Sequence, residues 1–215
     1  MNTTAGSDAV LASASTAGIV YLLRSTPTSP LRAWWVVALT GWDVGALIGV
    51  ATHGLVLAPS VETLLWQPLY VALGVAQALL VVAAVAAWRG ATRAQKLLPV
   101  MLAAAALFCW ATWRTHGNFL VFVVYSTGTT LFGLVVHAAL ARRGMPGAAG
   151  VAVGLGVSLG AGLFQASSLS MRLVWEFDHN GLFHLAQLVG LAILIPSLRR
   201  LLDGVAHGLP VQSTR

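Results

Sequence analysis

The stretch LWQPLYVALGVAQALLVVAAVAAW, residues 65–88, contains no Asp, Glu, Lys or Arg. A transmembrane helix needs about 20 consecutive, mostly apolar residues, so this stretch predicts a membrane-spanning helix. Backbone N–H and C=O groups find no water in lipid, and a single crossing segment satisfies them only within its own helix. The stretch therefore indicates an all-α membrane protein.

The rest of the chain has the same character. Of its 215 residues, 58% are hydrophobic and 8% are charged, whereas a soluble domain carries about 25% charged residues. We expect one transmembrane domain, residues 1–215, built as a seven-helix bundle. The expected spans are residues 8–23, 33–57, 65–88, 97–113, 118–141, 147–168 and 181–202.

Charge predicts the orientation of this bundle. The net charge is +6, but the basic residues sit in short loops between spans, so we expect no nucleic-acid partner. Basic residues accumulate on the cytoplasmic side of membrane proteins, which places the N-terminus outside and the C-terminus inside a cytoplasmic (inner) membrane. Ten of the twelve Lys and Arg residues then lie inside: Arg24, Arg32, Arg89, Arg93, Lys96, Arg142, Arg143, Arg199, Arg200 and Arg215.

The single lysine excludes one class of seven-span protein. Microbial rhodopsins bind retinal through a lysine in the last span, and here Lys96 lies in a loop.

A polar cluster opens the last span, in FDHNGLFHLAQ, residues 177–187. Asn180, His184 and Gln187 have helical spacing i, i+4, i+7 and share one face. Spans two and seven run in opposite directions, so His53, near the end of span two, lies at the same outer depth as His184. Ionisable groups at such depth usually face an interior cavity.

Two interpretations of these histidines stay open. Converging imidazoles commonly hold zinc, which makes His53, His184 and His179 candidate metal ligands, with Asp8 or Asp178 as a general base. The alternative is that the same side chains only hydrogen-bond across helices. Asp178 is also a candidate N-cap of the last helix.

Two further ionisable residues lie inside spans. Asp43, in the middle of span two, is either a hydrogen-bonded packing residue or a proton-relay group. We expect His137, near the inner end of span five, to snorkel towards water or to bond locally.

Several of these residues carry a resemblance to a known group. The chain resembles the CREST-type seven-span proteins, which include alkaline ceramidases and PAQR receptors, and most closely their bacterial members. The matching positions are Trp35 or Trp42, Gly45, Gly49 and His53-Gly54 in span two, Phe177, His179, Asn180, Phe183, His184 and Gln187 at span seven, and Gln165 and Asp8.

The resemblance implies a zinc site formed by one histidine of span two and an HxxxH pair of span seven. His53 and His184 match, and Asn180, with His179 beside it, takes the place of the first histidine of the pair. Gly49 stands where ceramidases have a serine.

Together these features predict a metal-dependent membrane hydrolase of a lipid-like amide or ester, with a polar pocket near the outer face. Asn180, Gln187, Gln165 and Asp8 would support that pocket. The alternatives are a non-catalytic, receptor-like protein that binds a lipid-like small molecule, and a small-molecule or proton-coupled carrier that uses Asp43 and His137.

Overall fold

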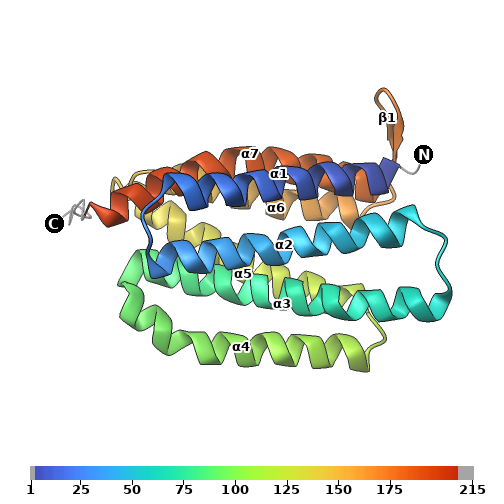
Figure 1. Cartoon of the computed structure of the whole chain (residues 1–215), viewed down its shortest axis with the longest axis horizontal. Coiled ribbons are helices and arrows are strands. Elements are labelled where there is room, and N and C mark those ends of the chain that lie inside the picture. The colour runs from blue at the N-terminus through green and yellow to red at the C-terminus, as the bar shows by residue number, and fades with distance from the viewer. Residues whose placement is uncertain (1–2, 208–215) are drawn as a thin grey trace.

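The protein is a bundle of long helices with one small hairpin (Figure 1). The structure, a computed structural model, describes residues 3–207 except for the side chain of Phe119. The elements in chain order are α1 (Thr3–Ser25), α2 (Pro30–Gly54), α3 (Pro59–Arg89), α4 (Ala91–Arg114), α5 (Phe119–Arg142), α6 (Ala148–Gln165), β1 (Met171–Arg172), β2 (Glu176–Phe177) and α7 (His179–Ala206).

Seven helices of this described part are long and apolar enough to cross a membrane, which confirms the predicted all-α bundle of seven long apolar helices. Their length and composition indicate a multi-pass membrane protein. Prolines and caps set several helix ends. Pro30 occupies the first turn of α2, where the side chain of Ser29 accepts a hydrogen bond from the Arg32 N–H, and proline suits this position because the first-turn N–H groups have no helical partner.

Several helices extend beyond the predicted spans, as α3 does by starting at Pro59 rather than at residue 65. Two helices, α2 and α6, end earlier than predicted. α2 ends at Gly54 rather than at residue 57, because Leu55 and Ala58 are extended and Pro59 starts the next helix, as expected for a residue that precedes proline. α6 ends at Gln165, and an unpredicted antiparallel hairpin follows, pairing Met171 with Phe177. Strands of two residues are too short to produce a visible alternation in the sequence.

Six of the helices form a closed ring. Neighbours around it are α1, α2, α3, α5, α6 and α7, and α7 packs back against α1. α4 lies outside the ring, mainly against α3, at the edge of the bundle in Figure 1.

The hydrophobic core fills one end of this ring. It joins the end of α1 to the start of α2, the end of α3 and the end of α7, with Leu22, Trp35, Leu80 and Leu198 fully buried. Glycines bring α6 and α7 together here: a Cβ on Gly154 would lie 3.0 Å from the carbonyl oxygen of Gly190. Small residues at helix contacts allow such close approach.

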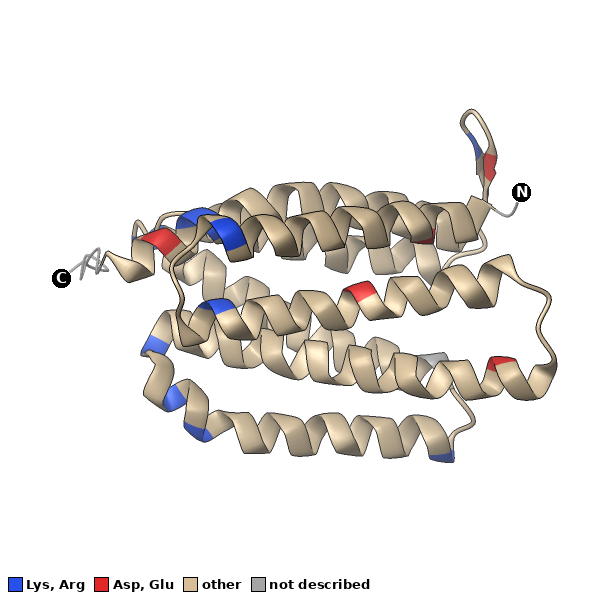
Figure 2. Ribbon diagram, viewed as in Figure 1, with Lys and Arg blue, Asp and Glu red and all other residues tan. Residues whose placement is uncertain are grey.

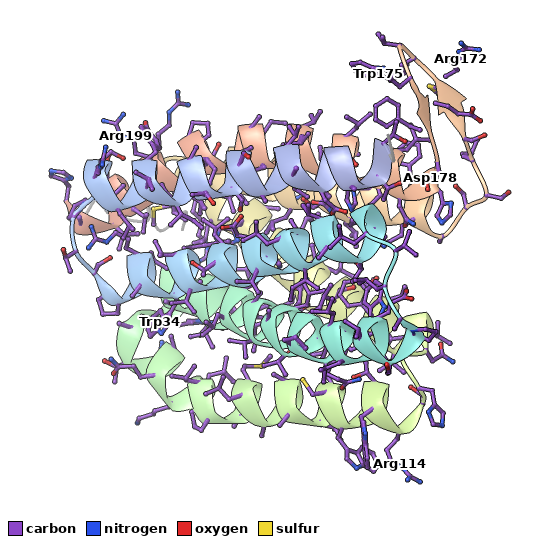
Figure 3. All side chains as sticks on the ribbon, turned by 45° about the vertical axis from the view of Figure 1, so that its right-hand side comes forward. Trp34, Arg114, Arg172, Trp175, Asp178 and Arg199 are labelled. Carbon is purple, nitrogen blue, oxygen red and sulfur yellow. The ribbon has the colours of Figure 1, made fainter. Side chains whose placement is uncertain are left out.

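The charged residues separate along the bundle. In Figure 2, most Lys and Arg residues gather at the end that holds the packed core. Figure 3 labels Arg199 at this end and Arg114 and Arg172 at the opposite end. This distribution matches the one that the sequence predicts, although Arg215 lies outside the described residues. The packed core therefore sits at the basic end.

Candidate functional site

A cavity of about 1840 Å³ opens in the bundle beyond the packed core. Its wall is mostly apolar and aromatic, as at Leu73, Phe122 and Leu159. Three ionisable side chains that share contacts, Asp8, His53 and His184, also line it. A largely apolar cavity with a few convergent polar groups is the usual form of a small-molecule site.

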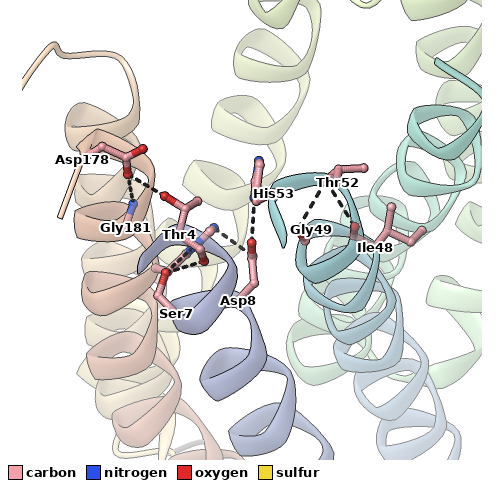
Figure 4. A network of polar contacts seen from close by, with 10 residues as sticks. Thr4, Ser7, Asp8, Ile48, Gly49, Thr52, His53, Asp178 and Gly181 are labelled. Carbon is pink, nitrogen blue, oxygen red and sulfur yellow. Dashed lines mark hydrogen bonds and ion pairs between the residues drawn. The ribbon is translucent and has the colours of Figure 1, made fainter. Parts of the chain in front are cut away.

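Asp8 is the centre of the polar cluster and is 2% exposed. Its Oδ2 lies 2.8 Å from Nδ1 of His53 on α2, and its Oδ1 lies 3.2 Å from Nε2 of His184 on α7. The centroids of the two imidazole rings are 6.4 Å apart. The carboxyl group of α1 therefore stands between the two histidines and links three helices (Figure 4).

Polar groups of α1 lie at both ring nitrogens of His184. The Ser7 hydroxyl donates to the carbonyl oxygen of Thr4 at 2.8 Å, and its oxygen lies 2.9 Å from Nδ1 of His184, at hydrogen-bond distance. Nε2 of the same ring lies 3.2 Å from Asp8. The position of the His184 ring is therefore fixed from α1.

The cluster places one carboxyl group beside two imidazoles, which suits a site of low dielectric because an unpaired buried charge is costly. Carboxyl and imidazole groups are the usual proton acceptors and donors of enzymes, and these three line the cavity within reach of a ligand.

A glycine makes room for this arrangement. A Cβ on Gly49 would lie 2.7 Å from Oδ1 of Asp8, closer than real Cβ contacts. One turn further along α2, a Cβ on Gly54 would lie 3.3 Å from the Cβ of Ala5. α1 can place its carboxyl group beside His53 because the facing positions of α2 have no side chain.

A second set of hydrogen bonds joins α1 to the start of α7. The carboxylate of Asp178 accepts from the Gly181 N–H and from the Thr4 hydroxyl, both at 2.8 Å, so the predicted N-cap is confirmed. Desolvation alone would raise the pKa of Asp178, but these two hydrogen bonds outweigh it and lower the pKa below its ordinary value. Figure 3 shows Asp178 at the base of the hairpin that carries Trp175.

The structure brings only part of the predicted metal set together. His53 and His184 both direct a ring nitrogen at Asp8, and His179, the first residue of α7, lines the same cavity. Among residues 3–207, no group of three or more His, Cys, Asp or Glu side chains is arranged to hold a metal ion. The residues as placed do not fit zinc, and the zinc site stays a prediction.

The remaining predicted residues take separate positions. Asn180, Gln187 and Gln165 line the cavity, and Gln187 donates to the carbonyl oxygen of Ser158 on α6 at 3.2 Å. Gln187 therefore joins α6 to α7 rather than contacting the two histidines.

Asp43 and His137 lie away from the cavity wall formed by the described residues. Asp43 accepts a hydrogen bond from the hydroxyl of Thr16 at 2.8 Å, which joins α1 to α2. His137 is fully buried, with Nδ1 bonded to the carbonyl oxygen of Gly133 at 2.7 Å and its ring 5.8 Å from that of Trp35. Of the two alternatives expected for His137, local bonding is the one present, because the packed core surrounds the ring.

Thr4 and Ser7 are site residues that the sequence did not reveal. Their signal is helical spacing: Thr4, Ser7 and Asp8 stand at i, i+3 and i+4 and so share one face of α1. In the sequence, the Ser and Thr residues of this helix only make the first span less hydrophobic than the others. Only their position beside α7 shows that they bind its polar groups.

The fold and the site together define a seven-helix membrane protein whose cavity carries a buried aspartate between two histidines. The chain belongs to the family of unknown function DUF6962, whose model matches residues 3–203. That range includes Asp8, His53 and His184. Comparison with curated proteins and with solved structures gave no match.

Proposed function

We propose that the protein binds a lipid-like amphiphile in its cavity, with the polar head of the ligand at Asp8, His53 and His184. The observation that carries this proposal is the single buried carboxyl–imidazole cluster in the wall of a large, mainly apolar cavity. A hydroxyl, amine or carbonyl head finds donors and acceptors there, while the chain of the ligand meets apolar side chains.

The membrane-embedded position of the cavity supports a lipid-like ligand. Aromatic side chains form part of its wall, with the ring centroids of His53 and Trp66 6.4 Å apart and those of Trp66 and Tyr70 6.2 Å apart. Such surfaces favour a long apolar molecule over a small hydrophilic one. A hydrophilic ligand would lose its hydrogen bonds to water on entering the cavity, whereas an apolar ligand has none to lose.

We also propose that the cavity end of the bundle faces the outside of a cytoplasmic membrane. The gathering of Lys and Arg at the other end supports this orientation. The N-terminus would then lie outside and the amphiphile would bind near the outer leaflet.

Binding of tritiated hexadecan-1-ol to purified protein in nanodiscs tests the first proposal. We expect saturable binding that falls at least about tenfold in Asp8→Ala, a change of about 1.4 kcal/mol. Thr40→Ala is the control, since Thr40 is exposed on α2 and bonds only within its own helix. Equal binding by all three proteins, each with native circular dichroism, would contradict the proposal.

A hydrolase is the second candidate, and the contacts of the Asp8 carboxyl group with two imidazoles favour it. Asp8 and His184 line the cavity, so a general base would be within reach of water beside a bound lipid-like amide or ester. Ser7 is not part of the cavity wall described here, which leaves it as a positioning residue for His184 rather than a nucleophile. Release of labelled fatty acid from N-acyl or ester substrates, lost in Asp8→Asn, tests this candidate.

Elemental analysis tests the metal-dependent form of the hydrolase. That form requires stoichiometric zinc that is lost in His53→Ala and in His184→Ala. Metal-free protein with native circular dichroism and full hydrolytic turnover would rule it out. The carrier alternative, based on Asp43 and His137, gains no specific support from their positions and stays a prediction.

A further inference from the structure

Gln77 is the one polar side chain of residues 71–88, and it is 6% exposed. It lies well inside α3 and forms part of the cavity wall, together with Thr130 on α5. A polar amide within an apolar helix is costly unless it is hydrogen-bonded.

Neighbouring hydroxyl groups hold one end of this amide. Its Oε1 accepts from the hydroxyl of Thr129 at 2.8 Å and from that of Thr130 at 3.5 Å. Both threonines are themselves buried. Nε2 makes no hydrogen bond to the residues that the structure describes, so two oriented N–H donors remain at the wall of the cavity.

Gln77 lies far deeper in the bundle than Asp8 and the histidines. Its neighbour Ala76 is level with Gly41 of α2, because a Cβ on Gly41 would lie 2.8 Å from the Cβ of Ala76. Gly49, which faces Asp8, is eight residues further along α2, and His53 is twelve residues further. A helix rises 1.5 Å per residue, so Asp8 and His53 lie about 12 Å and about 18 Å from Gln77 along the bundle axis.

We propose that Gln77 is a second anchoring point in the same cavity and that the ligand is an amphiphile with an oxygen-bearing group at each end. This inference rests on the proposed function. The hydrocarbon core is about 30 Å thick, so a lipid chain of 16 to 18 carbons in one leaflet covers about 15 Å. This length falls between the separations of Gln77 from Asp8 and from His53. A terminal hydroxyl or carbonyl oxygen would accept from Nε2 of Gln77.

The test compares hexadecane-1,16-diol with hexadecan-1-ol, which differ only at the deep end. In nanodiscs, we expect the unmodified protein to bind the diol about tenfold more tightly, the value of one well-made hydrogen bond to an otherwise unpaired group. Gln77→Met should bind both probes equally, because it has no N–H donor at the deep end of the cavity.

A second variant covers the case in which Gln77→Met fails to fold. Thr129→Val keeps the shape of the side chain but removes the hydroxyl group that donates to Oε1 of Gln77. The Gln77 amide then loses its fixed orientation, and we expect a smaller preference for the diol. Thr40→Val is the matched control on an exposed helix face and should retain the preference.

The outcomes separate this inference from the proposed function. If hexadecan-1-ol binds in an Asp8-dependent manner and the diol binds no more tightly, the Gln77 anchor is wrong and the head-group site stands. A preference that persists in both Gln77→Met and Thr129→Val also overturns the anchor. If neither probe binds the unmodified protein, both proposals fail.

Discussion

The carboxyl group of Asp8 occupies the space that a side chain at position 49 would fill. A Cβ on Gly49 would lie 2.7 Å from Oδ1 and 2.8 Å from both Cγ and Oδ2 of Asp8. The absence of a side chain on α2 is thus a condition for the carboxyl–imidazole cluster, and several expectations about the site depend on it.

Replacement of Gly49 by alanine should displace Asp8 from the two histidines. Overpacking of a buried site costs about 1–3 kcal/mol, and we expect Gly49→Ala to lower the free energy of unfolding by that amount in mixed micelles. Gly160→Ala is the control, because a Cβ there meets no atom within 4 Å. Equal stability of the two variants would show that α1 moves aside without loss.

Asp8→Ala should be more harmful than Asp8→Asn. Alanine removes the carboxyl group that the buried His184 and the half-buried His53 both contact, and a buried polar group that loses its partner costs about 1–3 kcal/mol. Asparagine presents one acceptor and one donor, so it can bond to both rings when they are neutral. Thermal unfolding followed by circular dichroism measures the difference, and a similar loss in both variants would mean that the cluster requires an ionised carboxylate.

Asp178 should make the stability depend on pH only in acid. Its pKa is lowered from the ordinary 3.8 in the folded protein, so its ionisation stabilises the fold fully above that pH and stops doing so as the pH falls through the lowered value. Asp178→Asn keeps a good N-cap but removes this titration. The difference in Tm between the two proteins should be constant at neutral pH and shrink below about pH 4.

A pH-independent difference would instead assign the effect of Asp178 to capping alone. Asp178→Ala measures that part, and the loss of an N-cap costs about 1 kcal/mol. Thr4→Val removes the second donor to the carboxylate and should raise the pKa of Asp178 towards its ordinary value.

The proposed orientation predicts which residues a membrane-impermeant thiol reagent reaches in intact cells. Cys109 is the one cysteine, so Cys109→Ala gives a cysteine-free background. Leu173→Cys, on the exposed hairpin, should react, whereas Arg142→Cys at the basic end should react only after permeabilisation. The reverse pattern would place the cavity on the cytoplasmic side.

Periodicity made some parts of the site predictable. The face shared by Asn180, His184 and Gln187 follows from residue spacing, as does the common depth of His53 and His184, because both depend only on helix geometry and chain direction. The role of Asp8 as the group between the histidines does not follow, since spacing within one helix says nothing about which helices are neighbours.

The hydrogen-bond partner of each polar side chain could not be predicted from the sequence either. Gln187 and His184 share a helical face, yet one bonds to the backbone of α6 and the other to α1. His137 has the same residue type and a similar apolar setting as His53, but it lies in packed core rather than in the cavity wall.

The sequence by itself determined that this chain forms seven helices long and apolar enough to cross a membrane, because lipid requires long apolar segments that satisfy their own backbone hydrogen bonds. The tertiary structure alone decided that α1 stands between α2 and α7 and that Asp8 fills the space left by Gly49. Contacts between helices depend on the shapes of facing surfaces. The role of a glycine such as Gly49 therefore becomes clear only when the atoms that fill the space of its absent side chain are known.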